Sequence, residues 1–347
     1  MRVLPPGQVE TRRFPVVGEL APAGSMSAQN WRLLVEGEVE SPLQLSFQDF
    51  LALPHRPLVM DVHCVTGWTR FDTEFTGVLL AELFRFAKPN SRARFVRFVA
   101  YSDRNHDTSL PLDVVIKDCW LVHQVDGQPL TPEHGGPLRI VTRNRYFYKS
   151  LKWVHRIILL PEDIPGYWER ESAYHNNADP QKEERYDEAR LASPAETERF
   201  RQLEDFAQYR RGRAQDVLIK ANLSNWSPKT KDLRGVQLKA CTFDGADLRG
   251  VDFRGANLTL SKFFRADLED ADFTCADLEG ADFSGAARLC RARLVDVSLA
   301  ATKFFMVTHD GRRRGPKDVR GMILRRGNGL LEEQEQYLRQ RGIVNEW

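Results

Sequence analysis

The sequence lacks an apolar run long enough to cross a membrane, and the first fifteen of its 347 residues contain no apolar segment typical of a secretion signal. It also lacks an excess of charge of either sign, because 50 basic residues against 48 acidic ones leave a formal charge of +2. That balance disfavours both a nucleic-acid-binding surface and an acidic mimic of DNA. We therefore expect a cytoplasmic protein that binds neither membranes nor nucleic acids.

Cysteine is scarce as well. The five cysteines are odd in number and widely spaced, with no C-x-x-C pair and no haem or iron–sulfur motif. This spacing favours reduced thiols over a disulfide framework. One of them, Cys64, ends a short apolar run in "MDVHCVTGWTRF" and precedes a Gly-Trp turn. From this stretch alone, Cys64 is either a buried structural thiol or a ligand for a metal.

The second half of the sequence contains a strict period of five residues. From Leu233 to Phe283 a Leu or Phe recurs at every fifth residue, often with alanine two positions earlier and Asp or Asn directly before it. This period fits neither an α-helix nor a β-strand, but it fits a coil that turns a corner every five residues. The register slips by one near Ala286 or Ala287 and resumes at Leu289. The pattern resembles the pentapeptide-repeat family, which implies a right-handed quadrilateral β-helix.

The coil is nearly neutral, with 11 basic and 12 acidic residues between positions 231 and 305. Neutrality favours a structural or docking role over mimicry of a DNA duplex. After the coil come a basic, glycine-rich stretch, "GRRRGPKDVRG", and a helical segment, "LLEEQEQYLRQRG". We predict that the helix caps the open end of the coil, and this end is also a candidate homodimer contact. Nucleic-acid binding by the basic stretch is the weakest alternative.

The first half has a different pattern. Between Trp31 and Leu160, short apolar runs rich in β-branched and aromatic residues alternate with Pro, Gly, Asp and Asn, which predicts an α+β, mainly β domain. Only "SFQDFLAL" and "TGVLLAELFRFA" have a helical pattern. Residues 181–213 are rich in charge, and Ser193, Pro194 and Glu196 form the capping box of a helical connector.

Several motifs of the first half occur in a characteristic order. They are "WRLLVEGEVESPLQLSFQDFLALP", "CVTGW" with "FTGVLLAELF", "DGQPLTPEHGGPLRIV", "YKSLKWVHRI" and "GYWERESAYHNNADP". Over roughly residues 12–190 this order resembles the molybdopterin-binding domain of the sulfite oxidase superfamily and the related bacterial sulfoxide reductases. The resemblance implies a molybdenum cofactor and makes Cys64 the thiolate that binds molybdenum, a role that suits a soft sulfur ligand.

The resemblance also implies which residues hold the pterin and its phosphate. They are His134 and Arg139 of "EHGGPLRIV", and Lys149, Ser150, Leu151 and Lys152 of "YKSLKW". Arginine suits bidentate binding of phosphate and lysine acts as a point charge, while the two glycines after His134 allow the main chain to approach closely.

The substrate side of the resemblance is weaker. Sulfite oxidases have an arginine five residues after the metal-binding cysteine, where this chain has Thr69, and a tyrosine where this chain has Pro165. We predict Arg70 and Tyr167 as catalytic residues at the rim of the substrate pocket. Trp68 lies at the same rim or packs on the pterin. The identity of the substrate therefore stays open.

Together these patterns predict an oxidoreductase domain at residues 1–190, a helical linker at 191–217, a β-helix at 218–308, and a basic loop with a capping helix at 309–347. The leading function is transfer of an oxygen atom to or from a small substrate such as sulfite, a sulfoxide or an N-oxide, with electrons exchanged through an external carrier. The alternative is a non-catalytic scaffold that uses the β-helix as a docking rod.

Overall fold

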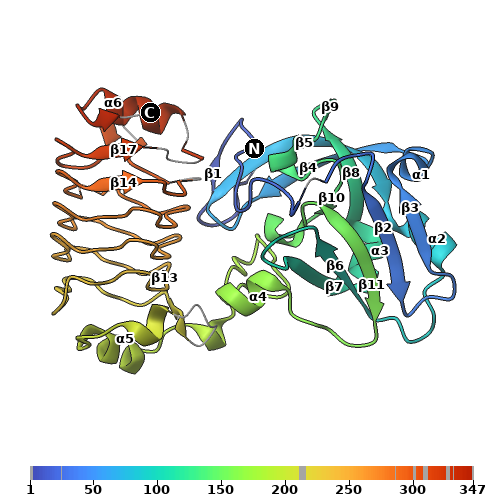
Figure 1. The fold of residues 1–347 in the computed structure, drawn as a ribbon, viewed down its shortest axis with the longest axis horizontal. Coiled ribbons are helices and arrows are strands. Elements are labelled where there is room, and N and C mark those ends of the chain that lie inside the picture. Colours follow the sequence, from blue (N-terminus) through green and yellow to red (C-terminus); the bar gives the residue numbers. More distant parts are fainter. Residues whose placement is uncertain are drawn as a thin grey trace. The chain divides into compact units, whose positions relative to one another are not determined.

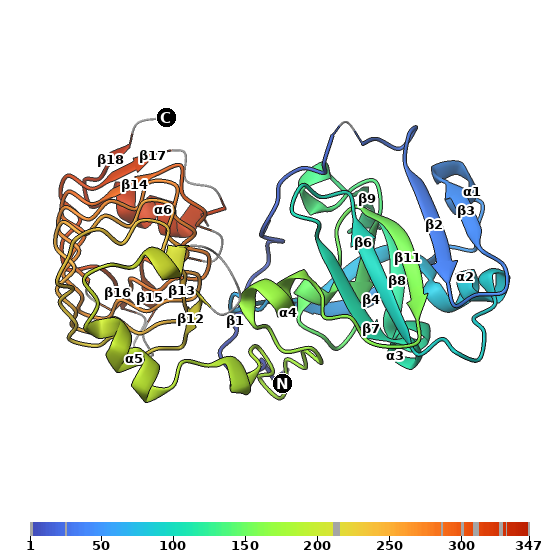
Figure 2. The ribbon, with the colours of Figure 1, turned by 60° about the horizontal axis from the view of Figure 1, so that its bottom comes forward.

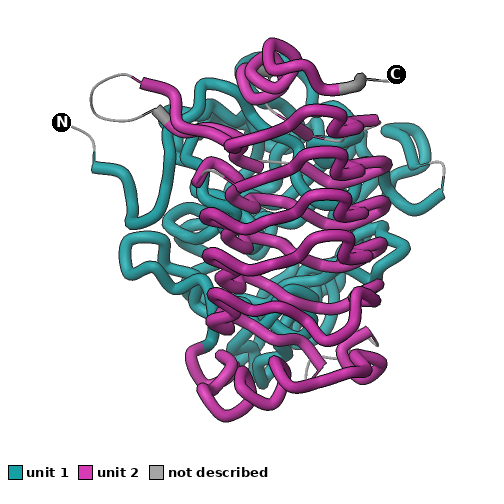
Figure 3. The backbone as a smooth tube through the Cα atoms, turned by 90° about the vertical axis from the view of Figure 1, so that its left-hand side faces the viewer, with its two compact units in different colours: residues 1–187 teal, residues 188–347 magenta. Residues whose placement is uncertain are grey.

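The computed structural model describes residues 3–24, 26–210, 216–285, 287–299, 302–307, 312–325, 329–330 and 332–345. The chain forms two compact units, Met1–Asp187 and Glu188–Trp347, which Figure 3 draws in different colours. The boundary between the units, after Asp187, lies three residues before the domain boundary that we predict from the sequence, which is after residue 190. None of the described helices is long and apolar enough to span a bilayer.

The first unit is built on two sheets (Figure 1). The six-stranded sheet has the order β1 (Val9–Glu10), β5 (Trp68–Leu79), β8 (Cys119–Val125) and β10 (Arg139–Thr142), with β4 (Arg56–His63) beside β5 and β9 (Gln128–Pro129) beside β8. The five-stranded sheet has the order β3 (Leu43–Ser46), β2 (Arg32–Gly37), β11 (Val154–Leu160), β6 (Phe95–Ala100) and β7 (Asp107–Pro111). Figure 2 shows β7, β6 and β11 side by side. The unit is mainly β, as the sequence predicts.

The helices of the first unit are short. They are α1 (Phe47–Leu51), α2 (Leu80–Ala87), α3 (Leu112–Asp118) and α4 (Tyr167–Ser172), with single 3₁₀ turns η1 (Pro132–His134) and η2 (Phe147–Lys149). α1 begins at a capping box in which Ser46 and Asp49 satisfy each other's backbone amides. The apolar core draws side chains from both sheets and from α2, among them Val35, Leu83 and Phe98.

The stretch "TGVLLAELFRFA" is not all helical, and our prediction was wrong for its first four residues. Residues 76–79 belong to β5, where Val78 pairs with Leu121 of β8. Gly77 explains the difference, because a Cβ there would lie 2.1 Å from the backbone oxygen of Leu121. Only glycine lets the two strands approach this closely, so pairing overrides the helical pattern.

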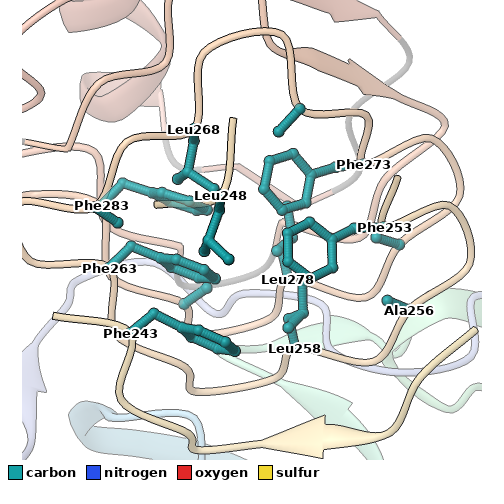
Figure 4. Close-up of a cluster of buried hydrophobic side chains, with 14 of the residues drawn as sticks. Phe243, Leu248, Phe253, Ala256, Leu258, Phe263, Leu268, Phe273, Leu278 and Phe283 are labelled. Carbon is teal, nitrogen blue, oxygen red and sulfur yellow. The ribbon is translucent and has the colours of Figure 1, made fainter. Parts of the chain in front are cut away.

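The second unit is a β-helix whose coils pair in parallel. Asp232 bridges to Asp252, and Asp252 bridges to Asp272, so successive coils are 20 residues apart. The Phe residues of successive coils stack at the same position inside (Figure 4). Ring centroids are 5.0 Å apart for Phe243 and Phe263 and 4.7 Å apart for Phe263 and Phe283. Pairs of residues in β12 (Leu218–Ile219) and β13 (Leu238–Lys239) form a regular two-stranded ladder.

The Asp and Asn residues of the repeat have a local role. The side chain of Asp247 accepts a hydrogen bond from the backbone amide of Arg249, two residues later, at 3.3 Å. Asp252 accepts in the same way from Arg254, and Asp277 from Glu279. These turns satisfy amides at the ends of the short straight segments. The repeat therefore specifies its own turns.

The register slip falls where the sequence predicts it. The pairing offset is 20 residues from Lys262 to Asp282 and 21 residues from Asp267 to Arg288, so one extra residue lies between Asp282 and Arg288. Ala286, one of the two predicted positions, lies outside the described residues.

Parallel pairing continues beyond residue 308, where the sequence analysis ends the coil. Arg288 bridges to Asp318, an offset of 30 residues, and β14 (Arg293–Val295), β17 (Ile323–Arg325) and β18 (Val344–Asn345) form a parallel sheet. The longer coil holds an antiparallel pair, β15 (Met306–Val307) and β16 (Arg313–Arg314). We did not predict this last coil, because the insertion breaks the five-residue period.

Both ends of the β-helix are covered. At one end α6 (Glu332–Arg339) carries Gln334, whose side-chain oxygen accepts from the backbone amides of Phe304 and Phe305 at 2.7 and 2.9 Å. At the other end α5 (Pro194–Arg201) begins at the predicted capping box and packs Phe200 against Trp226. The turns η3 (Glu188–Arg190) and η4 (Ala207–Arg210) flank α5.

The corners of the β-helix yield a stability prediction. From Gly235 to Gly280 every corner residue has a positive φ, including Cys275 at 60° and Gly250 at 64°. A residue with a Cβ is strained there by roughly 1–2 kcal/mol, and glycine is not. We expect Cys275→Gly, at an exposed position, to raise the free energy of unfolding of this unit by about 1 kcal/mol in urea titrations.

Gly250→Ala is the matched control of opposite sign. Nothing lies within 4 Å of its added Cβ, so a loss of about 1 kcal/mol would come from backbone strain alone. Equal free energies of unfolding for Cys275→Gly and Gly250→Ala would contradict a role for the corner conformation.

Candidate active site

Cys64 lies in a tight turn between β4 and β5. The amide of Cys64 donates to the carbonyl of Trp68 at 2.9 Å, and the amide of Gly67 donates back to the carbonyl of Cys64 at 3.1 Å. Gly67 has a φ of 101°, which favours glycine at this corner. The thiol is buried, with 6% of the residue exposed, and its sulfur lies 3.1 Å from the hydroxyl of Thr66. The strand end therefore holds the sulfur in a defined position.

A group of three basic side chains comes together around Gly135. Arg139 begins β10 and donates to the carbonyls of His134 and Ser150 at 2.8 and 2.7 Å. Gly135 has a φ of 98°, and a Cβ there would lie 3.1 Å from both Arg139 and Lys152. The turn η1, the start of β10 and the segment after η2 thus bring His134, Arg139 and Lys152 near one another. The resemblance assigns these three residues to the cofactor.

Within this group the carboxylate of Glu133 interacts electrostatically with His134 and Lys152, and the buried charge of Arg139 stands apart. Arg139 is 2% exposed, and no carboxylate in the described part of the chain pairs with it. Burial lowers the pKa of Arg139 to about 9. Burial also lowers the pKa of His134, and the charges of Arg139 and Lys152 lower it further. An anion bound among these side chains would offset the cost of burying the charge.

Phe14 joins the Cys64 turn to the basic group. Its ring stacks on His134 with centroids 4.7 Å apart and meets Trp68 edge-on at 6.3 Å. Its carbonyl lies 2.9 Å from Nε2 of His134, and Nζ of Lys152 donates to the carbonyl of Val17 at 2.9 Å. Phe14 could not be predicted from the sequence as a site residue, because it lies in an irregular N-terminal segment without periodicity.

The predicted rim residues lie in two places. Arg70 pairs with Asp126 at 2.5 Å. Its guanidinium carbon is 5.8 Å from the centre of the Phe14 ring, so Arg70 lies beside the ring that joins the Cys64 turn to the basic group. Tyr167 instead packs on His106 with centroids 4.8 Å apart. His106 contacts the carboxylate of Glu19, and the backbone oxygen of Glu19 accepts from Lys152 at 2.8 Å. Tyr167 is thus linked to the basic group through His106 and Glu19.

The motif "YKSLKW" separates into two environments. Lys149 is fully buried and pairs with Glu169, and it donates to the carbonyl of Ser109 at 3.0 Å. It therefore does not join the basic group, although the resemblance implies that it binds the cofactor. Ser150 contributes its carbonyl to Arg139, and Leu151 packs its side chain in the core.

Comparison with known proteins identifies the family. Residues 20–168 match the oxidoreductase molybdopterin binding domain, and residues 232–270 and 261–286 match pentapeptide repeats. The uncharacterized oxidoreductase YuiH of Bacillus subtilis is 38% identical over 186 residues, which cover 53% of this chain and 91% of that protein. The chain therefore belongs to the molybdopterin-binding oxidoreductases, and it is an enzyme of that family with pentapeptide repeats attached.

More distant relatives have named activities. The catalytic subunit of the protein-methionine-sulfoxide reductase of Campylobacter jejuni is 28% identical over 178 residues, which cover 46% of this chain and 60% of that subunit. Among solved structures, the sulfane dehydrogenase SoxCD of Paracoccus pantotrophus is 24% identical, with a TM-score of 0.40 and coverage of 44% of this chain and 43% of that one.

The site residues fit a molybdenum-pterin cofactor. Such a group ends in a phosphate and carries a ring system with hydrogen-bond acceptors. The uncompensated guanidinium of Arg139 suits the phosphate. The indole Nε1 of Trp68 is buried and has no hydrogen-bond partner among the described residues, so it is a donor left over for a ligand. The sulfur of Cys64 is a soft donor suited to molybdenum.

The Lys149–Glu169 pair yields a second prediction. Lys149→Met leaves the buried carboxylate of Glu169 without its cation, which we expect to cost about 3–5 kcal/mol of unfolding free energy in urea titrations. The double change Lys149→Met with Glu169→Leu removes both charges and should recover most of that loss.

The pair of Arg85 and Glu82, in which the arginine is exposed, is the control, and Arg85→Met should cost less than about 1 kcal/mol of unfolding free energy. A double variant no more stable than the single one would show that the buried pair is not the source of the loss.

Proposed function

We propose that this protein is a molybdenum-pterin-dependent oxidoreductase that transfers an oxygen atom to or from a small substrate. Cys64 serves as the thiolate ligand of molybdenum. The observation that carries the proposal is the buried charge of Arg139, which has no carboxylate partner among the described residues and lies near His134 and Lys152. Phe14 connects this group to the turn that carries Cys64, directly after β4.

The residues have separate roles in this proposal. Arg139, His134 and Lys152 bind the phosphate, and Ser150 and Leu151 contribute backbone groups beside it. Trp68 donates its indole hydrogen to the ring system. The cofactor supplies the two-electron redox chemistry when bound. An external carrier exchanges the electrons.

We further propose that the substrate is uncharged and of the sulfoxide type. Thr69, at the position where sulfite oxidases have an anion-binding arginine, is fully buried and donates its hydroxyl to Gln8 at 3.2 Å. The nearest arginine in sequence, Arg70, is paired with Asp126. Neither Thr69 nor the paired Arg70 supplies a free cation at the position where sulfite oxidases have their arginine, which favours a neutral substrate over sulfite. The relative from Campylobacter, whose name states that it reduces protein methionine sulfoxide, supports the same class.

Arg70 and Tyr167 remain proposed rim residues of the substrate pocket. For the coil, the 20-residue offset between paired positions supports the quadrilateral form with one pentad on each side, and we propose the right-handed sense of its family. The cytoplasmic location and a homodimer through the C-terminal end stay predictions.

Metal analysis tests the cofactor proposal. Protein from a host that makes molybdenum cofactor should contain about one molybdenum per chain. Cys64→Ser should lose most of the metal, because it removes the soft ligand, and Arg139→Met should lose pterin and metal together. Cys290→Ser, in the β-helix, is the matched control and should keep both. Metal-free wild-type protein from such a host would favour the scaffold alternative.

A dye-linked assay tests the substrate class. Loaded protein should reduce small sulfoxides with a reduced artificial dye as electron donor. With the oxidised dye as electron acceptor, it should oxidise sulfite at least about tenfold more slowly. The physical reason is the missing cation at Thr69. Faster turnover of sulfite than of any sulfoxide would refute the neutral-substrate assignment and leave the cofactor proposal standing.

A further inference from the structure

Two buried side chains from outside the matched residues 20–168 reach the turn that carries Cys64. The first is Gln8, which is 8% exposed. Its Nε2 donates to the carbonyl of Cys64 at 3.0 Å, and its Oε1 accepts from the hydroxyl of Thr69 at 3.2 Å. One amide therefore ties the turn to the next strand.

The backbone around Gln8 is itself fixed to that strand. β1 runs parallel to β5 with Val9 opposite Trp68, and the amide of Val9 donates to the carbonyl of Gly67 at 2.9 Å. The amide of Thr11 donates to the carbonyl of Thr69 at 2.8 Å. The side chain of Gln8 is thus held at a set distance from the Cys64 turn.

The second side chain is Arg185, which is 7% exposed. Its Nη1 donates to the carbonyl of Val65, its Nη2 donates to the carbonyl of Pro6 at 3.1 Å, and its guanidinium carbon is 5.2 Å from the centre of the Tyr146 ring. The nearest carboxylate, on Glu183, is 3.8 Å from Nε and half exposed. The donors of Arg185 are therefore directed mainly at backbone carbonyls.

We propose that Gln8 and Arg185 are positioning residues for Cys64. The consecutive carbonyls of Cys64 and Val65 each accept a hydrogen bond from one of them, which fixes two successive peptide planes of the turn and with them the direction of the Cβ of Cys64. A metal ligand needs such support from surrounding groups to hold its geometry. The assignment rests on the proposed role of Cys64 as a molybdenum ligand.

The test measures local opening of the turn in full-length protein produced without cofactor. Alkylation of Cys64 by iodoacetamide is followed by mass spectrometry, with Cys290 of the same molecule as internal reference. Loss of a buried hydrogen bond favours local opening, so Gln8→Leu and Arg185→Met should each raise the rate at Cys64 roughly tenfold. Gln8→Glu keeps the acceptor for Thr69 but loses the donor to Cys64, and it should also raise the rate.

Gln334→Leu is the matched control. Gln334 is also 8% exposed and clasps backbone groups, but it does so at Phe304 and Phe305 in the β-helix. It should lower the thermal stability of its own unit and leave the rate at Cys64 unchanged. A general loss of stability would instead raise the Cys64 rate in all variants alike.

In cofactor-loaded protein, Gln8→Glu should retain molybdenum and shift the absorption band of the metal–thiolate bond. Cys64 rates within about twofold of wild type in Gln8→Leu, Gln8→Glu and Arg185→Met would overturn the positioning assignment. Full molybdenum in Cys64→Ser would instead overturn the role of Cys64 as a ligand and leave the alkylation result intact, so the two failures are distinguishable.

Discussion

The buried positive charge of Arg139 is the constraint on which the arrangement of the first unit depends. A guanidinium away from water is tolerated only if its donors are satisfied, and here the carbonyls of His134 and Ser150 accept them. This requirement brings the turn before β10 and the segment after η2 together, with Gly135 at their point of closest approach. The hydrogen bonds satisfy the donors, but no carboxylate among the described residues pairs with the charge. A bound anion would balance it.

The two units differ in how much of them a single sequence predicts. In the β-helix each contact recurs 20 residues later, so one period describes pairing, stacking and turns together. Its last coil was not predicted, because an insertion interrupts the five-residue period between Arg288 and Asp318. In the first unit the contacts join distant positions, such as Phe14 with His134 and Glu36 with Arg156. No local pattern encodes such pairs.

The same limit explains the outcome at the site. The motif order predicted the family, which the comparisons show, and it led to the prediction that Cys64, His134, Arg139 and Lys152 form one functional group. Lys149 and Lys152 stand three residues apart, yet Glu169 takes one and the carbonyls of Val17 and Glu19 take the other. Partners far away in the chain therefore decide which lysine lies near His134 and Arg139. For the same reason, the contacts of Gln8 and Arg185 with the Cys64 turn could not be predicted from the sequence.

The amide of Gln334 has a consequence for the size of the β-helix. By donating and accepting at Phe305, this side chain imitates the peptide groups of one more coil. The β-helix therefore ends where α6 supplies these hydrogen bonds, and the number of its coils does not depend on the pentads before that point. A unit of whole coils inserted ahead of this lid would lengthen the rod without exposing an edge to which another molecule could add.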